Sequence, residues 1–378
     1  MNIAIFGLSY SSSWGNGHAT TWRALMRGLH ERGHHVTFFE RDVPWYASNR
    51  DLDHSAHGDL VFYSSLHPWS EIANRLVDAD AIVLGSYVPE GVALARRLIA
   101  LDAAPLAFYD IDTPVTLAKL AGGDEDYLAA DTIPHFDVYL SFSGGDALTI
   151  LQRQWGARLA VPFYCGVDTG LYRPLSIPAR WDLGYLGTWA ADRQPTLDRL
   201  LLEPARRMPE RRFVVAGPQY PPGIAWPDNV ERIDHVPPPE HPAFYARCRY
   251  TLNVTREAMI ELGHSPSVRL FEAGACGAAI LTDRWRGIEE VFEPGRELLI
   301  VDRSEDVTRL LQEESEPLAR RLGRAARERV LRDHTAGRRA QELEHWLAVA
   351  HEGRTRSGRA AGMHRRREPA LQADGDEP

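Results

Sequence analysis

The start of the chain limits the possible folds more than any other part of the sequence. Residues 2–7 are apolar and predict a buried strand, and residues 8–17 predict a loop. A helix is predicted at His18–Arg32 and a second strand at His34–Glu40. Two strands that are joined through a helix usually lie parallel in one sheet. The sequence therefore predicts an α/β domain with a ligand cleft at the carboxyl ends of parallel strands.

The alternation of strands and helices continues, and it begins again in the second half of the chain. Further strands are predicted at Asp59–Ser64, Ala81–Gly85, Pro105–Asp110, Asp137–Phe142, Asp182–Gly187, Arg212–Gly217, Arg249–Thr255 and Glu297–Val301, followed by a long helix from Glu305 to His334. Residues 166–174 carry Gly and Pro around an extended segment, which is typical of a hinge. We therefore place one domain at 1–168, a second at 169–335, an amphipathic helix at 336–350 and a disordered tail at 351–378.

Composition narrows the classes of function. The chain has 378 residues, of which 44% are hydrophobic and 25% charged, and this suffices for two domains with apolar cores. A formal net charge of −9 argues against a nucleic-acid partner, which would bind a basic surface. The three cysteines show neither disulfide nor metal-site spacing. Because Met1 leads straight into a strand and no apolar run could span a bilayer, we expect a cytoplasmic protein without a transmembrane segment.

Residues 264–283 carry the most informative motif, which reads as a loop, a helix, a tight turn and a buried strand. Ser265 is a good N-cap, and Pro266 fits the first helical position because its missing N–H costs nothing there. Gly277 is expected to end the helix in a left-handed conformation.

Polar residues of this helix point to a ligand. Ser265, Arg269 and Glu272 fall at i, i+4 and i+7 and so share one stripe. Free backbone amides from Ser265 to Ser267, at the positive end of the helix dipole, could bind an anion. Glu272 lies roughly 10 Å further along the axis, about the offset between a nucleotide's diphosphate and its ribose hydroxyls. The alternative is an amphipathic helix with a solvated Arg–Glu pair.

The run RLFEAGACG at residues 269–277 resembles the donor-site signature of GT-B glycosyltransferases, especially family 4 and the CgeB-like group. This resemblance implies two Rossmann-like domains that face each other across a cleft, with a C-terminal helix crossing back. It also implies that Glu272 holds the ribose of a nucleoside-diphosphate sugar such as a UDP-sugar. His264 occupies the position of a second Glu that contacts the donor sugar in family 4.

Other parts of the chain extend the resemblance. Residues 163–174 resemble the linker that enters the second domain of family 4 enzymes. Gly187 and Arg193 fall where such enzymes hold the donor diphosphate, and a guanidinium suits a phosphate because it donates two hydrogen bonds at once. Residues 234–237 are expected near the nucleotide base. GT-B enzymes generally use no metal, so none is expected here.

The loop before the first helix offers acceptor-side candidates. Trp14, Gly15 and Gly17 precede His18, which stands at a helix N-terminus and could act as a general base with a pKa near the working pH. The alternative for His18 is helix capping or packing. The loop lacks the G-x-G-x-x-G pattern, which disfavours a dinucleotide cofactor.

Two acids end a strand of the first half. Asp110 and Asp112 match a D-x-D pattern that binds Mn²⁺ in the other main glycosyltransferase fold, but the donor motif lies in the other half of this chain. We expect both acids to be acceptor-side or structural, with Asp112 facing the cleft as a candidate catalytic group. Metal binding is the alternative.

Together these features predict transfer of a hexosyl group from a nucleoside-diphosphate sugar to a hydroxyl or amine of a small molecule, glycan or lipid. The donor is a co-substrate, and no other cofactor is expected. The alternatives are a nucleotide-sugar epimerase or hydrolase and a non-catalytic nucleotide-sugar-binding protein, which His264 keeps open. The basic cluster at residues 364–367 could touch anionic lipid, although an acidic segment follows it and a solvated tail is the alternative.

Overall fold

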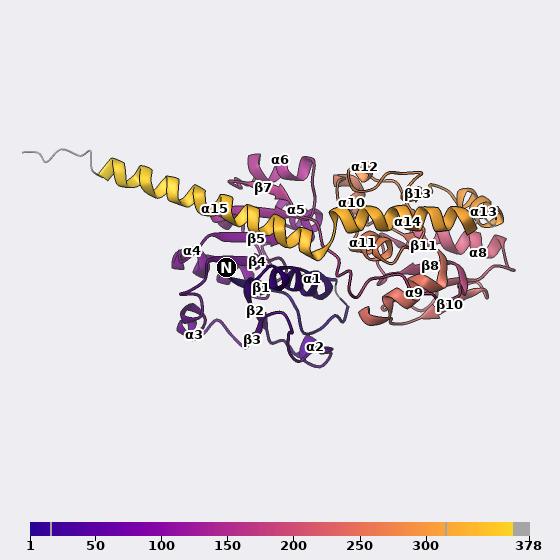
Figure 1. Cartoon of the computed structure of the whole chain (residues 1–378), viewed down its shortest axis with the longest axis horizontal. Helices are drawn as coiled ribbons and strands as arrows, with labels where there is room; N and C mark the ends of the chain where they lie inside the picture. The colour runs from indigo at the N-terminus through magenta and orange to yellow at the C-terminus, as the bar shows by residue number, and fades with distance from the viewer. Residues whose placement is uncertain (16, 314–315, 366–378) are drawn as a thin grey trace, which may run out of the picture.

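The computed structural model describes residues 1–15, 17–313 and 316–365, and it contains two parallel β-sheets. The first has the strand order β3-β2-β1-β4-β5-β6-β7, and the second has the order β10-β9-β8-β11-β12-β13. Both orders reverse beside their first strand, at β1 and at β8. A crevice forms at such a reversal, outside the carboxyl ends of the strands, and ligands bind there. Two domains with parallel sheets, as expected from the sequence, are confirmed (Figure 1).

The first domain alternates strands and helices from its start. Its strands are β1 (Asn2–Gly7), β2 (His35–Arg41), β3 (Asp59–Tyr63), β4 (Ala81–Gly85), β5 (Leu106–Asp110), β6 (Val138–Ser141) and β7 (Ala160–Pro162). Its helices are α1 (His18–Glu31), α2 (Pro44–Ala47), α3 (Trp69–Asn74), α4 (Gly91–Leu101), α5 (Thr113–Ala121), the 3₁₀ turn η1 (Ala130–His135) and α6 (Asp146–Arg153).

The second domain repeats this plan. Its strands are β8 (Trp181–Leu186), β9 (Phe213–Ala216), β10 (Val230–Ile233), β11 (Cys248–Asn253), β12 (Ile280–Thr282) and β13 (Leu299–Ile300). Its helices are α7 (Gln194–Leu197), the π-turn η2 (Asp198–Leu202), α8 (Glu203–Arg207), the 3₁₀ turn η3 (Pro238–Glu240), α9 (His241–Arg247), α10 (Glu257–Leu262), α11 (Val268–Ala275), α12 (Ile288–Val291), α13 (Ser304–Gln312) and α14 (Glu316–Asp333).

The single long helix predicted from Glu305 to His334 is wrong, because this stretch forms two helices, α13 and α14. Pro317 lies in the first turn of α14. A proline lacks the N–H that a continuing helix needs, but it is tolerated in a first turn.

Two chain segments cross between the domains side by side. The linker between β7 and β8 meets the turn between α14 and α15 (Ala336–Arg365) at Val167. The Val167 N–H donates to the His334 carbonyl at 2.9 Å, and the Ala336 N–H donates to the Val167 carbonyl at 2.9 Å. From there α15 returns across the first domain (Figure 1).

Helix α15 packs closely against α1. A Cβ at Gly28 would fall 2.3 Å from the Ala336 carbonyl oxygen, so only glycine permits this approach. Arg32 and His34 both contact the Glu344 carboxylate at 2.5 Å.

The expectation that the chain is disordered from residue 351 is wrong as far as Arg365, where α15 ends. Arg354 explains part of this difference, since it donates to the Asp137 carboxylate at 3.1 Å and to the Ala104 carbonyl at 3.2 Å. Such long-range contacts leave no periodic apolar signal in the sequence. Residues 366–378, with part of the basic cluster, lie outside the described residues.

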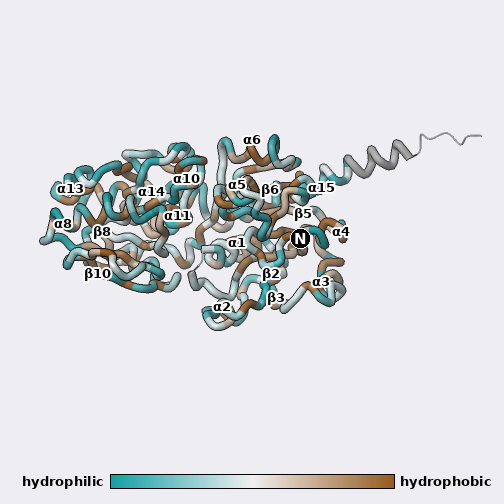
Figure 2. The backbone as a smooth tube through the Cα atoms, turned by 180° about the vertical axis from the view of Figure 1, so that it is seen from behind, coloured by the Kyte–Doolittle hydropathy of each residue, from teal (hydrophilic) through white to brown (hydrophobic). Residues whose placement is uncertain are grey.

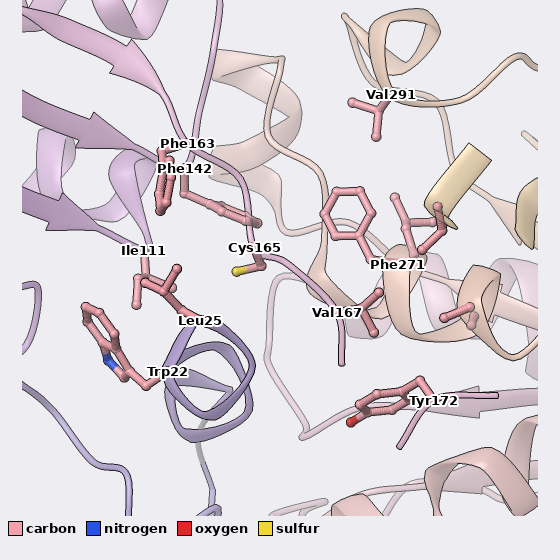
Figure 3. Close-up of a cluster of buried hydrophobic side chains, with 14 of the residues drawn as sticks. Trp22, Leu25, Ile111, Phe142, Phe163, Cys165, Val167, Tyr172, Phe271 and Val291 are labelled. Carbon is pink, nitrogen blue, oxygen red and sulfur yellow. The ribbon is translucent and has the colours of Figure 1, made fainter. Parts of the chain in front are cut away.

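Buried apolar side chains pack against the faces of both sheets and also at the junction between the two domains. In Figure 2 the hydrophobic residues concentrate along the central strands, whereas outer helices such as α13 are largely hydrophilic. One buried cluster continues from Trp22 of α1 through Val167 of the linker to Phe271 of α11 (Figure 3). The two domains are therefore packed together around the site described next.

Candidate active site

Helix α11 begins at Val268, two residues later than expected, with Ser267 as its N-cap. The Ser267 hydroxyl accepts from the Arg269 N–H at 3.4 Å. The expectation that Ser265 caps this helix is wrong. Ser265 is fully buried, donates to the Gly263 carbonyl at 2.9 Å and lies 2.5 Å from the Ser143 hydroxyl of the first domain. Ser265 therefore joins the domains, and the stripe of polar residues reduces to Arg269 and Glu272.

The end of α11 matches the expectation. Gly277 has φ +71° and donates its N–H to the Gly274 carbonyl, and the Ala278 N–H reaches back to the Ala273 carbonyl at 3.0 Å. This is a Schellman motif, which satisfies the last helical carbonyls and turns the chain into the next strand. It fixes α11 against β12 and so sets the position of Glu272.

Glu272 is a buried carboxylate with polar partners from two other segments. The Tyr172 hydroxyl, in the linker, donates to Glu272 Oε1 at 3.0 Å, and His241 Nδ1 lies 3.7 Å from Oε2. Burial alone would raise the pKa of Glu272, but His241 and the positive charge of Arg269 outweigh it. The pKa therefore lies below its ordinary value, and Glu272 is ionised at neutral pH.

Arg269 and Arg193 retain hydrogen-bonding capacity beside Glu272. The Arg269 side chain donates no hydrogen bond within the part of the chain that the structure describes, and its Nε is shielded from solvent. Arg193 Nη2 donates to the Thr188 carbonyl at 2.6 Å, while its Nε has no partner among the described residues. Two guanidinium groups with unused donors favour an anionic ligand.

These groups line two adjoining cavities. The smaller, of about 90 Å³, is lined by residues that include Gly187, Gly217, His235, Arg269 and Glu272. The larger, of about 410 Å³, is lined by Arg193, Ser267 and Arg269 from the second domain. Gly15 and Gly17 of the first-domain loop line both cavities. The cleft therefore lies between the domains.

The structure brings His18 and Asp112 into the same larger cavity as Arg193 and Arg269. Residues that are far apart in sequence meet because the carboxyl ends of both sheets face one another.

His18 is the first residue of α1, and its ring stands edge-on to Tyr87 with centroids 5.4 Å apart. Burial lowers the pKa of His18 to about 4. The expectation of a pKa near the working pH is therefore wrong, because the cleft desolvates the imidazolium. His18 is neutral at neutral pH and is a weak proton acceptor there.

Asp112 ends the loop after β5 and faces the second domain. Its Oδ2 accepts from the Tyr87 hydroxyl at 3.2 Å and from Arg256 Nη1 at 3.4 Å. Its Oδ1 has no hydrogen-bond partner among the described residues. Burial raises the pKa of Asp112, and the charge of Arg256 and the Tyr87 hydroxyl limit the rise.

Asp110 has a different, internal role. It is fully buried and accepts from the Thr116 hydroxyl at 2.7 Å and from the Tyr139 hydroxyl at 2.6 Å. Burial raises the pKa of Asp110 to about 6. Its oxygens hold the start of α5 in place, which supports the structural reading over a metal ligand. In the described ranges, no three His, Cys, Asp or Glu side chains form a group that could hold a metal.

Besides Ser265, two further expected site residues line neither cavity. The His264 ring packs against the backbones of Gly145 and Gly287, and its Nδ1 lies 3.1 Å from the Glu290 carboxylate. His264 is not among the residues that line either cavity, so its position does not support the predicted donor-sugar contact. Trp14 is 44% exposed and also lines neither.

The structure adds residues that the sequence did not single out. Tyr172 and His241 surround Glu272, while Tyr87 and Arg256 surround Asp112. Tyr172 lies inside the linker that we recognised, so its motif was visible although its contact was not. For Tyr87, Arg256 and His241 we find no sequence signal, since each acts only across a domain or strand boundary.

The domain arrangement and the helix that crosses back define the GT-B fold, and solved structures share it. Sucrose-phosphate synthase from Thermosynechococcus elongatus matches with a TM-score of 0.68 at 15% identity, over 92% of this chain and 98% of that one. HepE from Anabaena, in complex with UDP and glucose, matches with a TM-score of 0.68 at 12% identity, over 92% and 100%. An α-glucosyltransferase, in complex with UDP-glucose and DNA, matches with 0.71 at 14% identity, over 92% and 99%. The predicted GT-B fold is confirmed.

The second half of the chain also matches a family by sequence. Residues 193–345 match a family model described as glycosyl transferase-like, and this stretch contains Arg193, Arg269 and Glu272. The narrower family 4 or CgeB-like grouping stays a prediction. No curated protein has a matching sequence. Within the described residues, no helix is long and apolar enough to cross a membrane.

Proposed function

We propose that this protein is a glycosyltransferase of the family 4-like or CgeB-like group, which moves a hexosyl group from a nucleoside-diphosphate sugar to a hydroxyl or amine. The observation that carries this proposal is the Arg269 guanidinium, which has unused donors beside the buried, ionised Glu272. An anionic group next to a pair of hydroxyls satisfies both residues at once. A nucleoside diphosphate presents that pattern in its diphosphate and ribose.

Each part of the donor has a place in the cleft. Arg269, Arg193 and the first free amides of α11 face the diphosphate, and the Glu272 carboxylate accepts from the ribose hydroxyls. The loop that includes His235 lines the same cavity as Glu272 and would border the base. Gly187 lines the smaller cavity without a side chain, which lets the diphosphate approach the end of β8 closely.

The chemical step is a displacement at the anomeric carbon. The acceptor oxygen or nitrogen forms a bond to that carbon as the bond from the carbon to the phosphate oxygen breaks. The leaving diphosphate takes the bonding electron pair, and the proton that the acceptor loses passes to the Asp112 carboxylate, the candidate catalytic group of the first domain. Arg193 and Arg269 stabilise the charge that develops on the leaving group. Because these cations are already in place, the step as proposed needs no metal ion.

Acceptor-side chemistry falls to the first domain, where His18 and Asp112 line the larger cavity. Gly15 and Gly17 border both cavities and would contact donor and acceptor together. The proposed binding partners of this protein are therefore the nucleotide sugar and an acceptor that binds on the first-domain side of the cleft.

A panel of nucleotides and nucleotide sugars, read by thermal shift, tests the donor assignment. A ligand at 100 times its Kd should stabilise the folded protein by about 2.7 kcal/mol. The selected nucleotide sugar is then incubated with candidate acceptors, and free nucleoside diphosphate is measured. Turnover of the donor alone would favour an epimerase or hydrolase, and binding without diphosphate release under any acceptor would favour a binding protein. If no nucleotide binds, the proposal fails.

A further inference from the structure

The larger cavity has an apolar wall on its first-domain side. Ile111 follows β5, Phe142 follows β6 and Cys165 lies in the linker, and all three are buried and line the cavity. Figure 3 shows the three side chains close together at the ends of the first-domain strands. Leu8 of the first domain and Met259 of α10 in the second domain also line the cavity. A wall of this kind buries the apolar body of a ligand, whereas a few polar groups orient it.

Charge at this end of the cavity is negative once the donor is bound. Arg256 is shared between Asp112, at 3.4 Å, and Asp192, at 3.7 Å, so two carboxylates face one guanidinium. Arg193 and Arg269 line the same cavity, and Arg193 also acts on Asp112, but the two negative charges of a bound diphosphate would match these two guanidinium groups. An acceptor that carried a phosphate or carboxylate would therefore meet unbalanced negative charge in a partly desolvated site.

We propose that the acceptor is a molecule with an apolar or aromatic body and no anionic group, and that Asp112 accepts the hydrogen bond from its reacting hydroxyl or amine. This inference rests on the proposed function, because it assigns the part of the cleft that the donor leaves free. The apolar body lies against Ile111, Phe142 and Cys165.

Asp112 has the capacity for this contact. A carboxylate offers about four acceptor positions. In the described structure Oδ1 has no partner, and the two contacts of Oδ2, at 3.2 and 3.4 Å, are long. Tyr87 and Arg256 hold the carboxylate from both domains, so it is oriented before the acceptor arrives. A hydroxyl that reaches it exchanges a hydrogen bond to water for a charge-assisted one.

Three matched probes test the acceptor class in the presence of the nucleotide that the thermal-shift panel selects. Phenyl β-D-glucoside carries an aromatic body and hydroxyls, its 6-phosphate adds an anion, and methyl β-D-glucoside removes the aromatic body. Saturation-transfer NMR and competition give their affinities. Phenyl β-D-glucoside should bind at least about tenfold more tightly than either of the others, which corresponds to about 1.4 kcal/mol.

The Asp112→Asn variant gives a second readout. This variant removes one negative charge and should therefore weaken the binding of phenyl β-D-glucoside. The difference in affinity between phenyl β-D-glucoside and its 6-phosphate should become smaller, while the donor Kd stays unchanged. Asp126→Asn, at an exposed position of the same domain, is the control and should change nothing. Equal or tighter binding of the phosphate to the wild-type protein, no binding of any probe, or an unchanged preference in Asp112→Asn would overturn the inference. If the wild-type protein binds no nucleotide, that result would instead count against the proposed function.

Discussion

Replacement of Glu272 by Gln is the most direct perturbation of the donor site. Glutamine keeps the volume of the side chain and can still accept from the Tyr172 hydroxyl, which now lies 3.0 Å from Oε1. It removes the negative charge that faces His241 and Arg269. The variant therefore separates the charge of the carboxylate from its packing.

The expected loss follows from the kind of hydrogen bond. A hydrogen bond to a charged group contributes about 1.5–3 kcal/mol, and one between neutral groups about 0.5–1.5 kcal/mol. If ribose hydroxyls donate to Glu272, the amide retains part of this contribution, so we expect a loss of about 1–2 kcal/mol. That corresponds to a nucleoside-diphosphate Kd raised roughly 5- to 30-fold.

Isothermal titration calorimetry of the wild type and Glu272→Gln measures this change. Tyr172→Phe removes the hydroxyl that orients Glu272 but keeps the charge, so its effect should be smaller. Glu261→Gln, at an exposed position of α10, should bind as the wild type does. Wild-type affinity in a folded Glu272→Gln variant would refute the assignment of Glu272 to the ribose.

Four further predictions test separate parts of the structure. His18→Ala should leave the donor Kd unchanged and lower kcat less than tenfold, because an imidazole whose pKa is about 4 is a poor base at neutral pH; a loss of 10²–10⁴-fold would make His18 the general base. Turnover should survive EDTA, and activity that is lost with EDTA and restored by Mn²⁺ or Mg²⁺ would contradict the metal-free mechanism. Burial raises the pKa of Asp110 to about 6. The contribution of Asp110 to the free energy of unfolding is therefore complete below pH 3.8 and decreases as the pH rises to 6. The decrease is about 3 kcal/mol, at about 1.4 kcal/mol per pH unit. Urea unfolding of Asp110→Asn should lack this slope between pH 4 and 6, and an unchanged slope would refute it. Gly28→Ala should lower Tm by several degrees, because its Cβ meets the Ala336 carbonyl oxygen, and a Tm equal to that of the wild type would show that α15 adjusts freely.

Local rules predicted the parts of the fold that depend on neighbours in sequence. Apolar runs and their spacing placed the strands except β7 and β10, which were not predicted. Gly277 ended α11 because a left-handed residue is needed there. The parallel arrangement followed from alternation alone. These features need no knowledge of distant contacts.

The start of α11 shows where local rules fail. Ser265 and Ser267 are both good N-caps by residue type, and the choice between them depends on Ser143, which lies in the other domain. His264 stands eight residues before Glu272, at the position of a donor-site residue in the resembling family. Its ring nevertheless packs against Gly145 and Gly287 and does not line either cavity. In both cases a contact between domains decided the position of a side chain.

The candidate site combines both kinds of information. Glu272, Arg269 and Arg193 were found from motifs within single segments, and the structure brings them to one cleft with His18 and Asp112. The partners that tune these groups come from elsewhere. Against the effect of burial, His241 and Arg269 lower the pKa of Glu272. Burial raises the pKa of Asp112, and Arg256 limits that rise.

The position of Tyr172 connects the hinge to the donor site. Tyr172 belongs to the linker between the domains, yet its hydroxyl lies 3.0 Å from Glu272 Oε1 and 3.2 Å from His241 Nδ1. Val167, a few residues earlier, pairs with the turn before α15. A change in linker geometry must therefore either carry Tyr172 along or break its hydrogen bond to a buried carboxylate, which is costly. Because of this bond, the arrangement of the domains and the orientation of Glu272 cannot vary independently.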